Sequence, residues 1–294
     1  MDENNWLADR FEEHRSLLRS VAYRMLGSLT EADDAVQNTW VRVSRAEMSK
    51  VENLGGWLTT IISRICLNML RSRGVRREDS LETRVPDPVI SPVGELGPED
   101  EAVLADSVGL ALLVVLDALA PAERLAFVLH DMFDLPFEEI APMVGRSPTA
   151  ARQLASRARR RVRGAEIPEP DLARQRAVVD AFFLAARGGD LDALVALLHP
   201  DVVLRVDSGP GRPAASMVVR GAEAVARQAR LGANPAALLH PALINGAAGV
   251  VITLDGRPHV VMAFTVVNDQ VVELDLIADP GRVGRVASAV IGGE

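Results

Sequence analysis

Apolar residues in the first part of the chain recur at the three- and four-residue intervals of a helix. Residues 30–33 (TEAD) have the spacing of a helix N-cap, in which a hydroxyl and a later carboxylate satisfy free backbone donors. A break at residues 53–56 (NLGG) precedes a second helix that begins at Trp57. Residues 1–77 are therefore expected to be helical, with two apolar stripes: Ala32, Ala35, Val36, Trp40 and Val43, then Trp57, Leu58, Ile61, Ile62, Ile65 and Met69.

The second helix also carries a polar face. Arg64, Asn68 and Arg71 are spaced by four and three residues, so they fall on one side of the helix. The preceding loop, residues 50–56, is flanked by Trp40 and Trp57. A stacking surface beside a basic helix face suits a flipped or unpaired base, although aromatic residues at these positions fit a structural core equally well.

Residues 78–100 have a different character, because prolines and glycines interrupt any helix and the segment is acidic. This pattern predicts a linker. Helical periodicity then resumes over residues 101–165.

The most informative pattern lies between Leu135 and Arg163. A short helix begins near Pro136, Gly145 marks a tight turn, and Ser147 with the following proline supplies an N-cap and first-turn residue for the next helix. Two helices around a glycine turn, the second ending in arginines, are typical of a helix-turn-helix. Pro142 is expected to shorten or kink the first helix of this motif.

Helices and strands are segregated in residues 170–294. Helical patterns at about 172–187 and 190–198 precede strand-like runs at 202–206, 217–220, 250–254, 259–267 and 271–277. That order predicts an α+β domain rather than a βαβ one. The expected fold class is therefore multidomain, with two all-α modules followed by an α+β domain.

The net charge is −8, but acidic and basic residues are unevenly distributed along the chain. From Glu78 to Glu123 the single basic residue is Arg84, among many Asp and Glu residues. The end of the helix-turn-helix is instead basic, with no acid between Arg152 and Arg163. Such asymmetry favours an anionic partner for the helical part, despite the acidic sum.

Composition excludes several classes of protein. The longest apolar run, residues 108–116, is far shorter than the roughly 20 residues of a membrane span. The amino terminus lacks the basic and apolar regions of a signal peptide, so a cytoplasmic protein is expected. Cys66 is the only cysteine, and no metal site or cofactor is predicted.

The second helix of the helix-turn-helix has the chemistry to read bases in a major groove. Thr149, Arg152, Gln153 and Ser156 lie near its amino end; arginine can bond guanine and glutamine adenine in bidentate fashion. If about four of the later arginines met phosphates, the logarithmic salt slope of binding would be about −3.6. The alternative is a solvated basic helix at the end of a domain.

Three segments resemble the modules of bacterial extracytoplasmic-function sigma factors. Residues 22–28 (AYRMLGS) with 31–37 (EADDAVQ) resemble their core-binding segment, and residues 56–73 resemble their promoter-melting helix. Residues 119–163 are similar to their second module, which reads the upstream promoter element. The resemblance covers the first half of the chain, in order and at the family's spacing.

This resemblance implies a sigma factor that binds core RNA polymerase, at its clamp and flap regions, and promoter DNA. It divides the chain into region 2 (1–77), a linker (78–100), region 4 (101–165) and a carboxy-terminal domain (170–294). The implied polymerase-binding residues are Asp33, Asp34, Val36, Gln37 and Trp40. The implied residues for the minus-10 strand are Lys50, Asn53, Trp57, Arg64, Asn68 and Arg71. Those for the upstream element are Ser147, Thr149, Arg152, Gln153, Ser156, Arg157 and Arg160.

The carboxy-terminal half resembles SnoaL-like, NTF2-like domains, in which paired helices and a curved sheet enclose a conical cavity. Residues 84–88 (RVPDP), 207–211 (DSGPG) and 278–282 (ADPGR) partially match three short motifs of the sigma factors that carry such a domain. The resemblance implies that this domain contacts the sigma modules within one chain and modulates their activity.

Ionisable residues on the expected strands are candidates for a ligand pocket inside the cone: Arg205, Asp207, His259 and Asp275. Their spacing demands no catalysis, and a lone histidine on a strand is usually structural, so no enzymatic activity is expected. Two alternatives remain open from the residues alone. One is a helix-turn-helix regulator with a ligand-sensing tail that never meets polymerase, and the other is a SnoaL-type enzyme with an attached DNA-binding segment.

Overall fold

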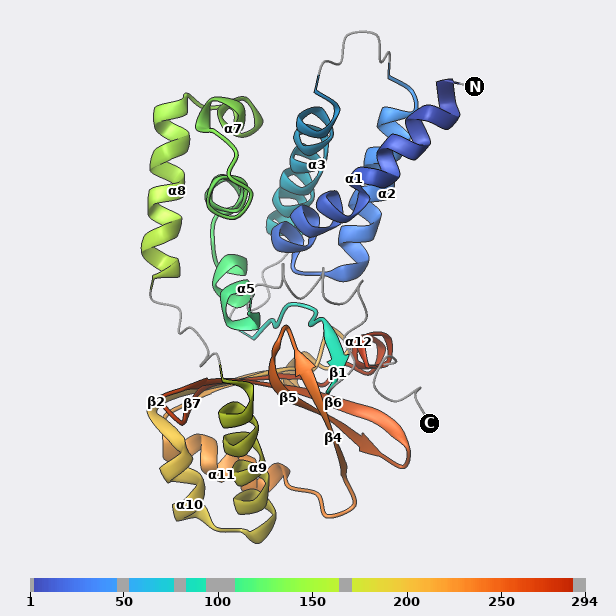
Figure 1. The fold of residues 1–294 in the computed structure, drawn as a ribbon. Coiled ribbons are helices and arrows are strands. Elements are labelled where there is room, and N and C mark those ends of the chain that lie inside the picture. Colours follow the sequence, from blue (N-terminus) through green and yellow to red (C-terminus); the bar gives the residue numbers. More distant parts are fainter. Residues whose placement is uncertain (1–2, 47–52, 77–82, 94–108, 164–170, 288–294) are drawn as a thin grey trace. The chain divides into compact units, whose positions relative to one another are not determined.

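The computed structural model describes residues 3–46, 53–76, 83–93, 109–163 and 171–287. The chain forms two compact units (Figure 1). The first contains residues 1–79 and 115–164, and the second contains residues 80–114 and 165–294.

The first unit begins with the helices α1 (Glu3–Leu26), α2 (Leu29–Val43) and α3 (Leu54–Arg76), which pack against one another. Their shared core includes the fully buried Leu18, Met25, Leu58 and Ile62. The cap of α2 differs from the prediction. Ser28 is the N-cap residue, with its hydroxyl accepting from the Glu31 amide, and residue 30 already lies inside the helix.

The helix-turn-helix follows in the same unit. Its two helices are α7 (Phe137–Val144) and α8 (Pro148–Val162). They are preceded by α5 (Leu110–Asp117), α6 (Pro121–Phe127) and the π-helical turn η2 (Val128–Met132). Gly145 has a φ of 68°, a left-handed conformation that suits glycine at the turn. Pro142, which was expected to shorten or kink this helix, lies inside α7: the helix continues to Val144, and the proline is exposed on its outer side.

The second unit is built on a mixed sheet of seven strands within the described residues, in the order β1-β4-β5-β6-β7-β2-β3. Neighbouring strands are antiparallel except for β2 and β7. The strands are β1 (Ile90–Pro92), β2 (Leu198–Asp207), β3 (Met217–Arg220), β4 (Leu238–Ile244), β5 (Ala247–Leu254), β6 (Arg257–Val267) and β7 (Gln270–Ile277).

The helices α9 (Leu172–Gly188), α10 (Leu191–Leu197) and α11 (Ala222–Gly232) cover one face of this sheet, and α12 (Pro280–Val286) packs against β6 (Figure 1). A short 3-10 helix, η3 (Pro213–Ala215), joins β2 to β3. The apolar core lies between the helices and the sheet and includes Val179, Phe182, Val225 and Phe264. The predicted fold class, helical modules followed by an α+β domain, is confirmed.

The linker contributes a strand that the sequence pattern did not predict. In β1, Ile90, Ser91 and Pro92 pair antiparallel with Ile244, Leu243 and Ala242 of β4. Next to this pairing, the Val89 amide donates to the Asn245 side chain, and the Asn245 amide donates to the Val89 carbonyl. The linker is therefore an edge strand of the carboxy-terminal sheet.

Candidate nucleic-acid interface

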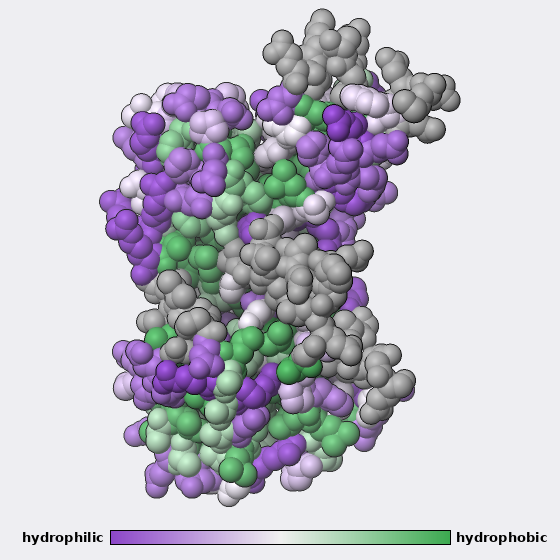
Figure 2. All heavy atoms as spheres, in the orientation of Figure 1, coloured by the Kyte–Doolittle hydropathy of each residue, from purple (hydrophilic) through white to green (hydrophobic). Residues whose placement is uncertain are grey.

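Helix α8 has two faces: one consists of alanines and is buried, and the opposite one is polar and exposed. Ala151, Ala155 and Ala158, spaced by four and three residues, are fully buried, and α8 packs closely on α6 through this side. Ser147 caps the helix by accepting from the Ala150 amide at 3.3 Å. The opposite side is exposed and carries Thr149, Arg152, Gln153, Ser156, Arg160 and Arg163. Its outer edge is largely purple in Figure 2.

Three other arginines lie on the flanks of α8, beside this outer face, and form ion pairs. The carboxylate of Glu123, 7% exposed, accepts from Arg157 at 2.7 Å and from Arg161 at 3.2 Å. On the other flank Arg159 donates to Asp131 at 2.5 Å. Arg157, expected among the DNA-binding residues, thus lies at the edge of the face, whereas Arg163 lies on it.

Helix α3 brings together the predicted polar residues for the minus-10 strand. Arg64, Asn68 and Arg71 are all exposed on one side of α3. Asn68 also lines a shallow depression between α2 and α3, with Asn38 and Arg42 on the facing helix. This depression is a polar surface next to the predicted face that the sequence pattern did not indicate.

The remaining minus-10 residues have other environments. Asn53 is exposed, and its side-chain oxygen accepts from the Gly56 amide at 3.0 Å, so it caps α3. Trp57 is half-buried in the first turn of α3. Lys50 lies outside the described residues.

Helix α2 divides the predicted polymerase-binding residues between surface and core. Asp33, Asp34 and Gln37 are exposed, whereas Val36 is 2% exposed and belongs to the helical core. Trp40 is half-buried, and the centre of its ring lies 5.1 Å from the centre of the Phe11 ring. A surface role for Val36 is therefore excluded, because its side chain points between the helices. One turn beyond Gln37, Val41 is exposed, an apolar surface residue that sequence reasoning missed.

A buried arginine joins the two halves of the helical unit. Arg124 on α6 is 1% exposed; its Nε donates to the Arg24 carbonyl at 2.9 Å and its Nη1 to Asp117 at 2.8 Å. The Arg24 guanidinium in turn lies over the Phe133 ring, 4.7 Å from its centre. Cys66 is buried, and desolvation raises the pKa of its thiol to about 12, so it remains protonated.

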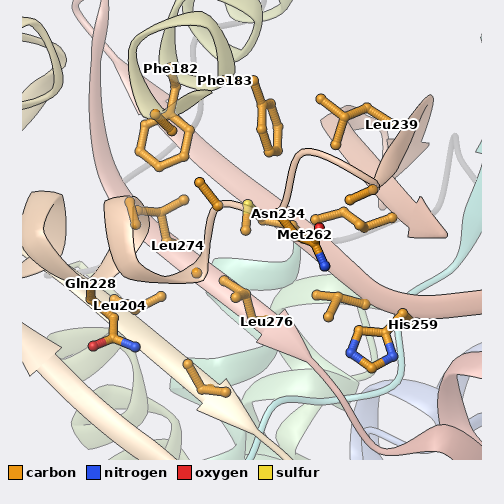
Figure 3. A pocket seen from close by; sticks show the side chains of 18 of the residues that line it. Phe182, Phe183, Leu204, Gln228, Asn234, Leu239, His259, Met262, Leu274 and Leu276 are labelled. Atoms are coloured by element: carbon orange, nitrogen blue, oxygen red, sulfur yellow. The ribbon is translucent and has the colours of Figure 1, made fainter. Parts of the chain in front are cut away.

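The carboxy-terminal domain has a cavity between α9, α11 and the helix-covered face of the sheet (Figure 3). Only one of the four predicted pocket residues lines this cavity. His259 does so, at a bulge where β6 has one extra residue opposite Ile252 and Thr253 of β5. Arg205 and Asp275 point away, because strand alternation sends their neighbours Leu204 and Leu274 into the cavity instead. The prediction for Arg205, Asp207 and Asp275 is corrected accordingly.

Arg205 and Asp275 instead form a buried ion network. Arg205 donates to Asp275 at 3.0 Å and to Glu273 at 3.1 Å. Burial raises the pKa of Asp275 to about 6; Arg205 acts against this shift, and Glu273 adds to it.

Asp207 belongs to a second buried network, which holds the linker and which we call the Arg282 clamp. Arg282 donates to Asp87 at 2.7 Å, to Asp207 at 2.6 Å and to the Val85 carbonyl at 2.6 Å. Asp207 also accepts from the Val85 amide at 3.0 Å. The three motif segments 84–88, 207–211 and 278–282 therefore meet at one place.

Close packing around the clamp requires a glycine. Gly209 has a φ of 75°, and a Cβ atom there would collide with the Asp279 carboxylate. Asp279 itself caps α12 by accepting from the Arg282 amide at 2.7 Å. The turn after β2 thus fits against the start of α12.

The sequence matches two known family models in the helical unit. Residues 10–76 match Sigma-70 region 2, and residues 109–162 match Sigma-70, region 4. With a helix-turn-helix in the second module, these matches define a bacterial sigma factor, a protein that binds RNA polymerase and promoter DNA.

Individual relatives narrow this class. The extracytoplasmic-function (ECF) RNA polymerase sigma factor SigJ of Mycobacterium tuberculosis is 42% identical over 220 residues, covering 74% of this chain and 70% of SigJ. SigI of the same organism is 32% identical over 297 residues, covering 100% of both chains. The crystal structure of M. tuberculosis SigJ matches with a TM-score of 0.71 and 35% identity, covering 94% of this chain and 97% of that one.

The chain therefore belongs to the ECF RNA polymerase sigma factors, and it directs promoter recognition. This family is not enzymatic. Membership decides between the alternatives that the residues left open, against a regulator that never meets polymerase and against a SnoaL-type enzyme. Among the described helices, none is long and apolar enough to cross a membrane.

Proposed function

We propose that the exposed side of α2 binds the clamp of core polymerase through Asp33, Asp34 and Gln37. This proposal is supported by the exposure of these three residues on α2, whose other side packs in the helical core. Val36 and Trp40 position this helix from within. Region 4 meets the flap in this proposal.

The polymerase contact is tested by charge reversal. Asp34→Arg is expected to weaken the complex with core polymerase at least tenfold, measured by fluorescence anisotropy of labelled protein. Asp9→Arg, at an exposed position of α1, is the matched control and should bind normally. Equal affinity of the two variants would remove α2 from the interface.

We further propose that the exposed face of α3 handles the separated minus-10 strand and that the outer face of α8 reads the upstream element. On α3 this face is Arg64, Asn68 and Arg71, with Asn53 and Trp57 at its amino-terminal side. Lys50, which precedes them in the sequence, is part of the same proposal. On α8 the face has base-reading groups near the amino end, from Ser147 to Ser156, and Arg160 where phosphates lie. Arg157 takes part from the flank.

The carboxy-terminal domain modulates this activity in our proposal by holding the linker between regions 2 and 4. The observation that carries this step is the Arg282 clamp together with the β1–β4 pairing. When residues 83–92 are bound to the domain, fewer residues of free chain connect regions 2 and 4. The domain therefore limits the positions that the two regions can take on polymerase and promoter DNA. Direct contact with the sigma modules is part of the same proposal.

Run-off transcription with core polymerase on a cognate promoter tests the modulation. Removing residues 171–294 and the substitution Arg282→Ala should both change the yield, and in the same direction, because both release the linker. Arg257→Ala, at an exposed arginine of β6, should leave the yield unchanged. If neither the deletion nor Arg282→Ala alters transcription, the domain does not modulate the sigma factor.

A further inference from the structure

Arg152, on the exposed face of α8, contacts an aromatic ring rather than a carboxylate. Its guanidinium carbon lies 5.1 Å from the centre of the ring of Phe137, the first residue of α7. The flanking residues Arg157, Arg159 and Arg161 are each paired with an acid, whereas Arg152 has no such pair among the described residues. A cation over an aromatic ring is attracted by the negative charge on the ring's face. Arg152 is therefore held in place without its charge being neutralised.

The Phe137 ring is itself held by a histidine. The centres of the Phe137 and His130 rings are 3.9 Å apart, and their planes are inclined by 31°. His130 lies in the π-helical turn η2, and its Nδ1 donates to the Leu135 carbonyl at 2.9 Å. Phe137 is 6% exposed. Because packing and hydrogen bonds restrict these two side chains, Phe137 presents a fixed surface to Arg152.

A fixed guanidinium favours the recognition of guanine. Arginine binds the edge of this base through two hydrogen bonds, so the guanidinium must lie in the plane of the base. A free arginine side chain has many rotamers, and ordering it on binding costs conformational entropy. The ring contact leaves N–H groups available for the base, since a guanidinium has five. An arginine that is ordered before binding therefore discriminates better between guanine and other bases.

We propose that Phe137 and His130 are positioning residues for recognition of the upstream element. They order the Arg152 guanidinium for one guanine, and thus determine a base preference without contacting DNA themselves. This role depends on the base-reading function proposed for α8. It adds two residues outside the recognition helix, on α7 and η2, to those that determine promoter specificity.

The experiment measures base preference with the complete polymerase complex. Core polymerase with this protein selects promoter duplexes that are randomised in the upstream element, and sequencing gives the preference at each base pair. Arg152→Ala should lose a preference for guanine of at least tenfold at one base pair, which identifies the base that Arg152 contacts. Phe137→Leu keeps an apolar side chain but removes the ring, and it should reduce the preference at that same base pair at least threefold.

The other base pairs show whether Phe137 has only a structural role. A loosened helix-turn-helix would weaken the preference at every position, whereas loss of positioning affects the base pair of Arg152 and leaves the one read by Gln153. His130→Gln should have the same selective effect, and Phe137→Tyr, which retains a ring, should keep the wild-type preference. Phe127→Leu, at a buried phenylalanine of α6, is the matched control and should select like the wild type.

The variants separate failure of this role from failure of the proposed function. An unchanged preference at every position in Arg152→Ala would contradict base reading by Arg152, and the positioning role with it. If Arg152→Ala loses the guanine preference but Phe137→Leu and His130→Gln retain it, or if they weaken all positions equally, the positioning role alone is overturned. Phe137→Met replaces Phe137→Leu if circular dichroism shows that the latter is unfolded.

Discussion

Arg124 is a buried charged residue that connects two parts of the helical unit. Its guanidinium bonds Asp117 and the Arg24 carbonyl, and therefore ties α6 to α1. A buried ion pair adds little stability compared with apolar residues of the same shape, but removing one partner leaves the other charge buried and uncompensated.

Arg124→Ala is therefore expected to lower the free energy of unfolding by about 3–5 kcal/mol. The loss can be measured by urea denaturation followed by tryptophan fluorescence, because Trp6, Trp40 and Trp57 all lie in α1–α3. Arg146→Ala, at an exposed arginine beside the helix-turn-helix glycine, should change the value by no more than about 0.5 kcal/mol. Similar effects of the two substitutions would contradict the role of Arg124.

Asp275 gives the carboxy-terminal domain a pH-dependent stability. Its pKa is about 6 in the folded protein, against an ordinary value of 3.8. Because the folded state holds the proton more tightly, this group stabilises the fold fully below pH 3.8 and loses that contribution as the pH rises through 6.

Between pH 5 and pH 7.5 the wild-type domain should thus lose about 1 kcal/mol relative to Asp275→Asn, which cannot ionise. Scanning calorimetry of the two proteins at both pH values measures this difference, and other titrating groups cancel in the comparison. A difference that is constant with pH would mean that Asp275 ionises normally in the folded protein.

At the scale of elements, α8 separates the residues that face outward from those that stabilise the module. Gln153 and Arg160 are on its outer face, whereas Arg157 is paired with Glu123. These positions make different predictions for promoter binding.

Gln153→Ala should reduce discrimination at one base pair of the upstream element by about 1–3 kcal/mol. Arg160→Ala should weaken binding to all sequences and reduce the magnitude of the logarithmic salt slope by about 0.9. Arg157→Ala is the matched comparison and should alter the slope less. Anisotropy titrations of the polymerase complex at several salt concentrations measure these quantities. The assignment fails if Arg157→Ala changes the slope as much as Arg160→Ala does.

Elements with a strong local pattern could be predicted from the sequence, and those fixed by tertiary partners could not. The apolar periodicity of α3 and the cap, proline and glycine around α8 are local signals. By contrast, α11 and β4 were missed: α11 is rich in alanine and arginine, and β4 contains Pro241. Strand β1 is only three residues long, and its partner β4 is far away in the sequence.

The same distinction holds for the candidate sites. The exposed faces of α3 and α8 follow from helical spacing alone, since the residues of each face are three or four positions apart. The pocket prediction needed the direction of each strand residue. An error of one position exchanges the two faces of a strand, as it did for Arg205 and Asp275.

At the scale of the whole molecule, the linker is part of the carboxy-terminal unit as much as a connection between sigma regions. Val85 is fully buried and Asp87 is 7% exposed, although both lie in a proline-rich acidic segment. Arg84, immediately before them, is the only basic residue between Glu78 and Glu123.

Trypsin can therefore cut this stretch only after Arg84, and cleavage there reports release of the linker. The wild-type protein should resist cutting at this bond, whereas Arg282→Ala should be cut at least tenfold faster because the linker loses its main polar contacts. Mass spectrometry of the fragments gives the rate, with Arg257→Ala as the control. Equal rates in the wild type and Arg282→Ala would show that the clamp does not hold the segment.

The β1–β4 pairing also determines which piece of the chain can exist alone. A fragment that starts at residue 170 lacks β1, so residues 242–244 of β4 keep β5 on one side and have no strand on the other. Bare sheet edges recruit other chains, and such a fragment should self-associate, while a peptide of residues 83–93 added in trans should restore the monomer. The independent folding unit is thus discontinuous in the gene, and region 4 is inserted between its two parts.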